Sequence, residues 1–231
     1  MKNIAVFAPH PDDEVLGCGG TIVKKLRCGD EVFVIFMTDG RYGLNEVGVK
    51  DPDPLEHKFI RKEEALKAAE ILGLKKENLF FLDIEDKTLG KHKFHALEKV
   101  VGILKDIHPT EVYFPQELEY NTDHRATYNI VKDAIEKLDL NTVEYCYAIA
   151  WKFPFFLLSH ILNENSFYNL MCTFLRRRLL YVDISKFLPI KVKAIRQYAS
   201  QLKIYSEHQK ETAIKKFILE ASLKNEEKFF V

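Results

Sequence analysis

Polar side chains gather near the N-terminus, directly after a short apolar run. His10, Asp12, Asp13 and Glu14 place one imidazole and three carboxylates within five positions. A structural core does not require such a group, whereas a bound cation does. A hydrolytic zinc site needs three ligands from His and carboxylate side chains, an open position for water and a separate base. This segment could supply two of the ligands and the base.

The third ligand must then come from elsewhere in the chain. His124, in Asn121-Thr122-Asp123-His124, is the best placed of the eight histidines. The acidic residue Asp123 directly precedes it, and its segment also follows an apolar run of the kind that forms strands. The two segments together predict a metal site more strongly than either does alone.

Strands alternate with helices in the part of the chain that carries these residues. Apolar, β-branched and aromatic runs predict the strands, and helical spacing of apolar residues predicts the helices. The expected strands are 3–8, 31–37, 78–84 and 111–115, and the expected helices are 13–28, 58–73, 93–108 and 124–137. This alternation predicts an α/β fold, with an open, mostly parallel sheet covered by helices on both faces. Ligands bind beyond the carboxyl ends of strands in such sheets, so residues 9–14 and 121–124 are expected on one rim.

The pattern changes after residue 141. Residues 143–151 and 179–184 predict strands, residues 190–205 predict a helix, and residues 151–175 are aromatic and irregular. No repeat, low-complexity tract or flexible linker separates this part from the rest. We therefore expect one domain, 1–231, in which residues 141–231 are an extension.

Composition narrows the classes of partner. Lys+Arg and Asp+Glu both number 34, so the protein has no net charge that would attract nucleic acid or an anionic membrane. A small molecule is therefore the expected partner. The four cysteines form no C-x-x-C pair and are expected to be reduced thiols. The first apolar run ends at His10, too early for a signal peptide, and no run reaches the ~18 apolar residues of a spanning helix. These features predict a cytoplasmic protein without a transmembrane segment.

Two further segments allow other interpretations. Glycines between Gly17 and Gly20 open a helix after the first strand, as in phosphate-binding loops, but no G-x-G-x-x-G is present. The aromatic segment 151–175 with Arg176, Arg177 and Arg178 could dock a lipid-linked sugar. Ordinary core plus a subunit interface, with the arginines at its rim, is the stronger interpretation.

The motifs resemble those of a known family, the LmbE-like or PIG-L zinc N-deacetylases. The most specific motif is Ala8-Pro9-His10-Pro11-Asp12-Asp13-Glu14, followed by Gly17-Cys18-Gly19-Gly20. Further similarity runs through Thr38-Asp39-Gly40, Arg61-x-x-Glu64-Ala65, Asp123-His124-Arg125, Val182-Asp183-Ile184-Ser185 and Tyr198-Ala199-Ser200-Gln201. The resemblance therefore spans nearly the whole chain.

The resemblance implies a Rossmann-like fold, one catalytic Zn²⁺ per chain and removal of an N-acetyl group from an N-acetylglucosamine-type sugar or its conjugate. Carried over to this sequence, it implies that His10, Asp13 and His124 bind the metal. Asp12 would be the general base, and would later pass its proton to the departing amine. Other divalent ions can occupy a site with two histidines and one aspartate. Members of the family often form trimers or hexamers, which implies a possible homo-oligomer.

The resemblance also implies substrate residues and contains one departure. Arg61 and Asp86 match positions near the substrate, and Asp123 belongs to the same substrate and oxyanion group. Where many members have a histidine that helps to stabilise the tetrahedral oxyanion, this chain has Asn121. An amide can donate a hydrogen bond but carries no full positive charge. The departure leaves an alternative open: a catalytically silent metal-binding protein of the same fold.

Overall fold

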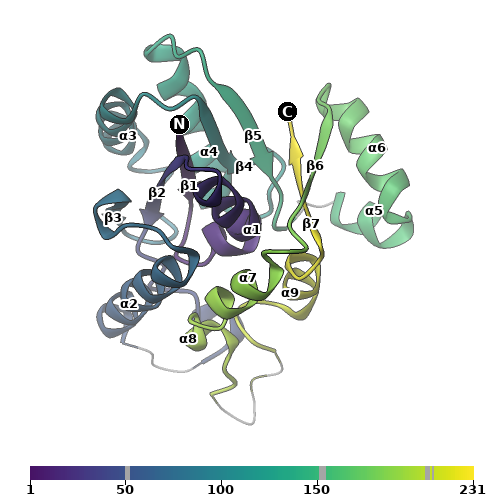
Figure 1. Cartoon of the computed structure of the whole chain (residues 1–231). Helices are drawn as coiled ribbons and strands as arrows, with labels where there is room; N and C mark the ends of the chain where they lie inside the picture. Colours follow the sequence, from purple (N-terminus) through teal and green to yellow (C-terminus); the bar gives the residue numbers. More distant parts are fainter. Residues whose placement is uncertain (50–52, 151–154, 206–208, 210) are drawn as a thin grey trace.

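The central feature of the molecule is a sheet of seven strands in the order β3-β2-β1-β4-β5-β7-β6 (Figure 1). The computed structural model describes residues 1–49, 53–150, 155–205, 209 and 211–231. The strands are β1 (Asn3–Ala8), β2 (Glu31–Thr38), β3 (Leu79–Ile84), β4 (Glu111–Pro115), β5 (Val143–Tyr147), β6 (Leu179–Asp183) and β7 (Glu226–Phe230). The first five pair in parallel, whereas β7 pairs antiparallel with both β5 and β6. The predicted α/β class with a mostly parallel sheet is confirmed.

Helices cover both faces of this sheet. The helices are α1 (Asp13–Arg27), α2 (Pro54–Leu72), α3 (Lys93–Ile107), α4 (Thr122–Lys137), α5 (Phe155–Ile161), α6 (Glu164–Leu175), α7 (Leu188–Ile195), α8 (Ala199–Leu202) and α9 (Lys216–Ser222). Side chains alternate along β1, so that Ile4 and Val6 join the core under α1, α2 and α7, while Ala5 and Phe7 join the core under α3, α4 and α6. Among the described residues, no helix is long and apolar enough to cross a membrane.

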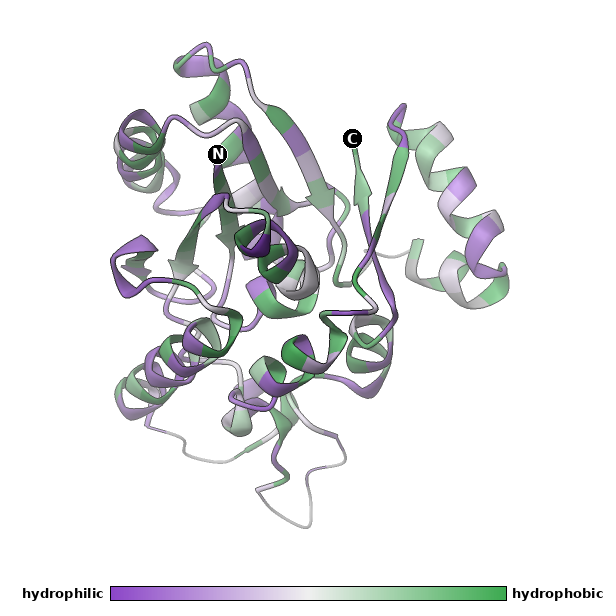
Figure 2. Cartoon of the chain, in the orientation of Figure 1, coloured by the Kyte–Doolittle hydropathy of each residue, from purple (hydrophilic) through white to green (hydrophobic). Residues whose placement is uncertain are grey.

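Helix α2 begins earlier than the apolar spacing predicts. It starts at Pro54 rather than at residue 58, because Asp53 accepts a hydrogen bond from Leu55 N and caps the helix with proline in its first turn. One face of α2 is buried and includes the charged residues Arg61 and Glu64. Figure 2 shows the corresponding alternation of hydrophobic and hydrophilic residues along this helix.

The C-terminal part differs most from the sequence-based expectation. The predicted helix 190–205 is in fact two helices, α7 and α8, separated by residues 196–198. Tertiary hydrogen bonds account for the break, since Tyr198 donates to Glu14 and Ser200 N donates to Glu64 at 2.6 Å. Strand β7 was not predicted at all, although it joins β5 to β6.

The aromatic segment predicted to be irregular also contains regular structure. Its described residues form α5 and α6, of which Phe167 and Met171 enter the core while Leu157, Ile161, Leu170 and Phe174 are exposed. The predicted strand 143–151 is shorter, since β5 ends at Tyr147. Residues 151–154 lie outside the described part of the chain.

The glycines of α1 serve close packing inside a helix rather than a phosphate-binding loop. A Cβ atom on Gly17 would lie 2.7 Å from the Tyr147 ring, and one on Gly20 would lie 2.5 Å from the Ile184 side chain. Thr21 N and Gly20 N donate to the buried carboxylate of Glu227, each at 2.8 Å. This arrangement fixes α1, and with it the first turn that carries Asp13, against β5, β7 and the residue that follows β6. The four cysteines are free.

A buried carboxylate at the start of β4 ties three parts of the chain together. Glu111 accepts hydrogen bonds from Lys2 Nζ at 2.7 Å, Lys25 Nζ at 2.6 Å and Tyr113 OH at 2.9 Å. Burial opposes ionisation, but these donors outweigh it and hold the pKa of Glu111 below its ordinary 4.5. Because the folded-state pKa is lowered, the ionised group stabilises the fold above the unfolded pKa, and this contribution is lost as the pH falls.

We predict that Glu111→Gln lowers the free energy of unfolding at pH 7 by about 1–2 kcal/mol, discounted for the partly exposed lysines. The difference from the parent should shrink below about pH 4, where the parent carboxylate is protonated as well. Urea unfolding at several pH values measures both effects, with exposed Glu98→Gln as the control. An equal loss at pH 3 and pH 7 would contradict the electrostatic explanation.

Candidate metal centre and active site

The candidate site lies where the chain leaves β1 and β4. These strands are neighbours in the sheet, and the chain turns in opposite directions from them, so their carboxyl ends mark the switch point of the sheet. Residues 9–12 connect β1 to α1, and residues 116–121 connect β4 to α4. The predicted meeting of segments 9–14 and 121–124 on one rim is therefore observed, since Asp13 and His124 are in contact.

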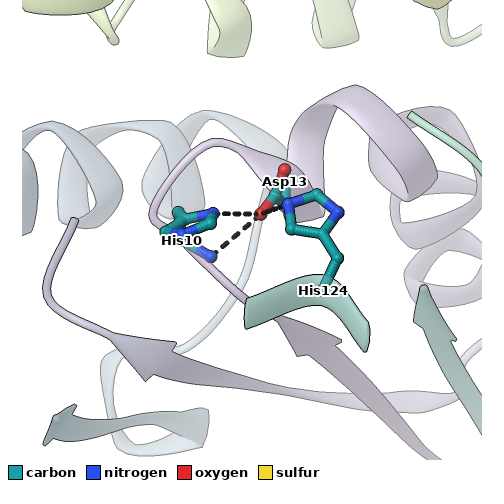
Figure 3. A group of neighbouring side chains, drawn as sticks. All are labelled: His10, Asp13 and His124. Atoms are coloured by element: carbon teal, nitrogen blue, oxygen red, sulfur yellow. Dashed lines mark hydrogen bonds and ion pairs between the residues drawn. The ribbon is translucent and has the colours of Figure 1, made fainter. Parts of the chain in front are cut away.

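Three of the predicted residues converge on one point. Asp13 Oδ2 lies 3.2 Å from His10 Nδ1 and 3.2 Å from His124 Nε2 (Figure 3). One ligand atom from each residue lies within 4.8 Å of the others, and all three residues are buried. Ligand atoms at ~2.0–2.2 Å from a tetrahedral zinc stand roughly 3.3–3.6 Å apart, so the spacing and the donor types both suit Zn²⁺.

Two further carboxylates lie behind His10 on its other ring nitrogen. His10 Nε2 is 3.3 Å from Asp86 Oδ1 and 3.5 Å from Asp123 Oδ2. Asp86 also accepts from Tyr42 N, and Asp123 accepts from Lys87 N and Leu89 N. These three residues form a second possible ligand group. Because backbone N–H groups already hold both carboxylates, they are better suited to fix the His10 ring so that Nδ1 faces Asp13.

Asp12 lies beside this centre in an unusual backbone conformation. Its φ is 128°, its N–H donates to Glu14 Oε2 at 3.0 Å, and its side chain lies 3.2 Å from the Arg61 guanidinium. Burial raises the pKa of Asp12 to about 7, against the opposing effect of Arg61. A carboxyl group with such a pKa can accept and return a proton near neutrality.

Arg61 is not on a solvated helix face. Its side chain is buried, and it donates to Pro11 O as well as contacting Asp12. Arg61 therefore fixes the turn that carries Asp12 and also lines a small polar hollow beside it. The expected substrate contacts of Arg61 and Asp86, which lines the same hollow, stay predictions.

Asn121 occupies the N-cap of α4. Its Oδ1 accepts from Asp123 N at 2.8 Å, which fixes the side chain at the start of the helix that carries His124. With Oδ1 engaged, the Nδ2 group is the donor that this residue can offer to a ligand.

Sequence reasoning missed Glu119, which is fully buried behind His124. Its carboxylate accepts from Ile149 N at 2.6 Å and from Ala150 N at 2.8 Å. Glu119 Oε2 also lies 3.6 Å from His124 Nδ1, which has no hydrogen-bond partner among the described residues. A carboxylate at this place favours the His124 tautomer whose Nε2 is free to bind a metal. An acidic residue in the strand-end loop, five positions before His124, was the available signal.

Comparisons with known proteins agree with this geometry. The family model described as PIG-L, GlcNAc-PI de-N-acetylase, matches residues 5–135, which is more than half of the chain and includes the three candidate metal ligands, Asp12 and Glu119. The chain belongs to the PIG-L family. The matched range ends before β5, so the family model does not include the C-terminal elements.

Several relatives of this PIG-L family member are named as deacetylases. The diacetylchitobiose deacetylase of Thermococcus kodakarensis is 29% identical over 204 residues, which cover 87% of this chain and 70% of that protein. A probable N-acetyl-alpha-D-glucosaminyl L-malate deacetylase 2 of Bacillus cereus is 29% identical over 153 residues, 64% of this chain and 68% of that one. The N,N'-diacetylchitobiose deacetylase structure from Pyrococcus horikoshii superposes with a TM-score of 0.66 at 25% identity, covering 87% of this chain and 71% of that one.

We predict that Glu119→Gln weakens zinc binding by about 10–100-fold, because its amide has a single acceptor oxygen, which cannot serve both backbone N–H groups and also face His124 Nδ1. Competition with a chromophoric chelator measures the affinity without any need for catalysis. Glu117→Gln, an exposed change in the same loop, is the matched control. Unchanged zinc affinity in the Glu119 variant would show that Glu119 does not orient His124 for metal binding.

Proposed function

We propose that this protein is a zinc-dependent hydrolase that removes the N-acetyl group from an N-acetylglucosamine-type amino sugar or its conjugate. The observation that carries the proposal is the convergence of His10, Asp13 and His124 beside the buried carboxyl group of Asp12. The named activities of the relatives support the reaction class and do not favour the alternative of a silent metal-binding protein.

In this proposal His10, Asp13 and His124 hold one zinc ion per chain. Zinc would act there as a Lewis acid towards the amide carbonyl and would lower the pKa of water towards ~7. Asp86 and Asp123 orient His10, and Glu119 orients His124, so that each ring presents one nitrogen to the site. Asp86 and Asp123, which were predicted as substrate or oxyanion residues, thus have at least one role in this proposal, the orientation of the His10 ring.

Asp12 moves the proton during hydrolysis. Its carboxylate accepts a proton from the attacking water and returns it to the nitrogen as the carbon–nitrogen bond breaks. Arg61, 3.2 Å away, favours the ionised form of Asp12 and so opposes the effect of burial. Asn121 Nδ2 donates a hydrogen bond to the oxygen on which negative charge develops.

The whole chain, 1–231, is assigned to one domain in this proposal, because β6 and β7 continue the sheet that begins with β3. The expected homo-oligomer, a trimer or hexamer, and the cytoplasmic location stay predictions.

The proposal is tested by metal analysis of the purified protein together with acetate release from N-acetylglucosamine, diacetylchitobiose and N-acetylglucosaminyl conjugates. We expect one equivalent of zinc and hydrolysis that a chelator abolishes and zinc restores. Asp12→Asn should keep the zinc but lower kcat about 10²–10⁴-fold, since the base is removed and the ligands are not. Asp106→Asn, exposed on α3, is the control. A full zinc content with no hydrolysis of any N-acylated amino sugar would favour the silent binder.

We predict that Asn121→His keeps its zinc and its activity but gives a different pH–rate profile. The imidazole can donate to the oxyanion as the amide does, and it titrates near neutrality whereas the amide does not. Zinc content and kcat/KM between pH 5.5 and 9 measure the effect. Loss of zinc in this variant would show that the assigned ligand set is wrong.

A further inference from the structure

Two hollows of opposite character meet at Asp12, Asn121 and Ala213, which line both of them. The first is polar, has a volume of about 100 Å³ and lies on the side of His10, Arg61, Asp86 and Gln201. The second has a volume of about 320 Å³ and lies on the side of Asp13 and His124. The reacting groups of the proposed hydrolase therefore stand between two different environments.

The larger hollow has mainly apolar walls. Leu16 comes from α1, Ile149 and Ala150 follow β5, and the rest of the wall comes from the segment that leads into α9. That segment contributes Ala213, Ile214, Phe217 and Ile218, with Lys215 as its polar member. The latter wall lies outside residues 5–135, the range that the family model matches.

The geometry of a secondary amide relates the two hollows to the two halves of a substrate. In the trans form the substituents on nitrogen and on the carbonyl carbon point in opposite directions. An amide held at Asp12 therefore sends its sugar into one hollow and its acyl group into the other. Hydroxyl groups need polar partners such as Arg61, Asp86 and Gln201, whereas an alkyl chain gains from an apolar wall.

The size of the apolar hollow exceeds what an acetyl group requires. A water-sized group such as a methyl needs ~10–15 Å³ of cavity, so an acetyl group would leave most of the 320 Å³ unfilled. We infer that the natural substrate carries an N-acyl chain longer than acetyl, which occupies the hollow between Leu16, Ala150 and Phe217. This inference rests on the proposed amide hydrolysis and extends it to N-acylated amino sugars.

Hydrolysis of such a substrate breaks the carbon–nitrogen bond of the amide. It adds the hydroxyl of water to the acyl carbon and a proton to the nitrogen, and gives a carboxylic acid and the free amine.

Glucosamines with N-acetyl, N-butyryl, N-hexanoyl and N-octanoyl groups test the inference, because all four give the same amine product. A buried methylene is worth about a factor of four, and hexanoyl has four more methylenes than acetyl. With two or three of them buried in this open hollow, we expect kcat/KM for hexanoyl to exceed that for acetyl by about ten- to a hundredfold. Release of glucosamine, measured with an amine-reactive fluorophore, gives the rates. A kcat/KM that stays level or falls with chain length overturns the inference but leaves the proposed function intact. If no compound releases amine while zinc is bound, the proposed function fails and the inference with it.

Two substitutions locate the chain in the hollow. Ala150→Phe fills the hollow while keeping the Ala150 N–H bond to Glu119, and Phe217→Asp places a charge in its wall. Each should lower the ratio of hexanoyl to acetyl kcat/KM at least tenfold. Phe94→Asp, on the exposed face of α3, is the matched control and should leave the ratio unchanged. If both variants leave the ratio unchanged, the hollow does not hold the acyl chain. The same conclusion follows if kcat/KM rises with an octyl group on the sugar of N-acetylglucosamine but not with a longer N-acyl chain.

Discussion

One carboxylate oxygen, Asp13 Oδ2, lies 3.2 Å from a nitrogen of His10 and 3.2 Å from a nitrogen of His124. His10 follows β1 directly, and His124 lies in the first turn of α4 after β4. The contact therefore requires β1 and β4 to be adjacent and their connections to diverge, which is the property of a switch point in a parallel sheet. The strand order, the position of α1 and the N-cap of α4 all contribute to this single meeting point.

Burying so many carboxylates at one place costs free energy, and different groups compensate different carboxylates. Asp12, Asp13, Glu14, Asp86, Glu119 and Asp123 are all buried. An unpaired buried charge costs several kcal/mol, which is why such groups are bonded or bind cations. Backbone N–H groups satisfy Asp86, Glu119 and Asp123, and Arg61 lies against Asp12. Asp13 accepts from His10 N at 2.9 Å and lies against two imidazoles. Burial opposes the charged form of these rings, but the carboxylates around them outweigh it and raise both pKa values, that of His124 to about 9. A divalent ion bound to these residues would supply that positive charge in place of the two protons.

Sequence patterns predicted the features that depend on local chemistry. Strand ends at Ala8 and Pro115 follow from apolar runs that stop at polar clusters, and these ends place the predicted ligands on one rim. Glu119 was missed because its role depends on the backbone of residues 149 and 150, which follow strand β5. The interruption of helix 190–205 has the same origin, since bonds from Tyr198 to Glu14 and from Ser200 to Glu64 override helical periodicity. Long-range partners of this kind leave no periodic signal in a single sequence.

The chain divides its chemistry and its selectivity between two parts of the same sheet. The proposed proton transfer and metal binding use residues 10–13 and 119–124, all within the range that the family model matches. The apolar hollow draws its largest wall from residues 213–218, which approach the site because β7 returns the chain to the sheet beside β5. Changes in that wall alter which group fits next to Asp12 without moving any of the proposed ligands. A fold arranged in this way can keep one reaction while its C-terminal segment changes the substrate.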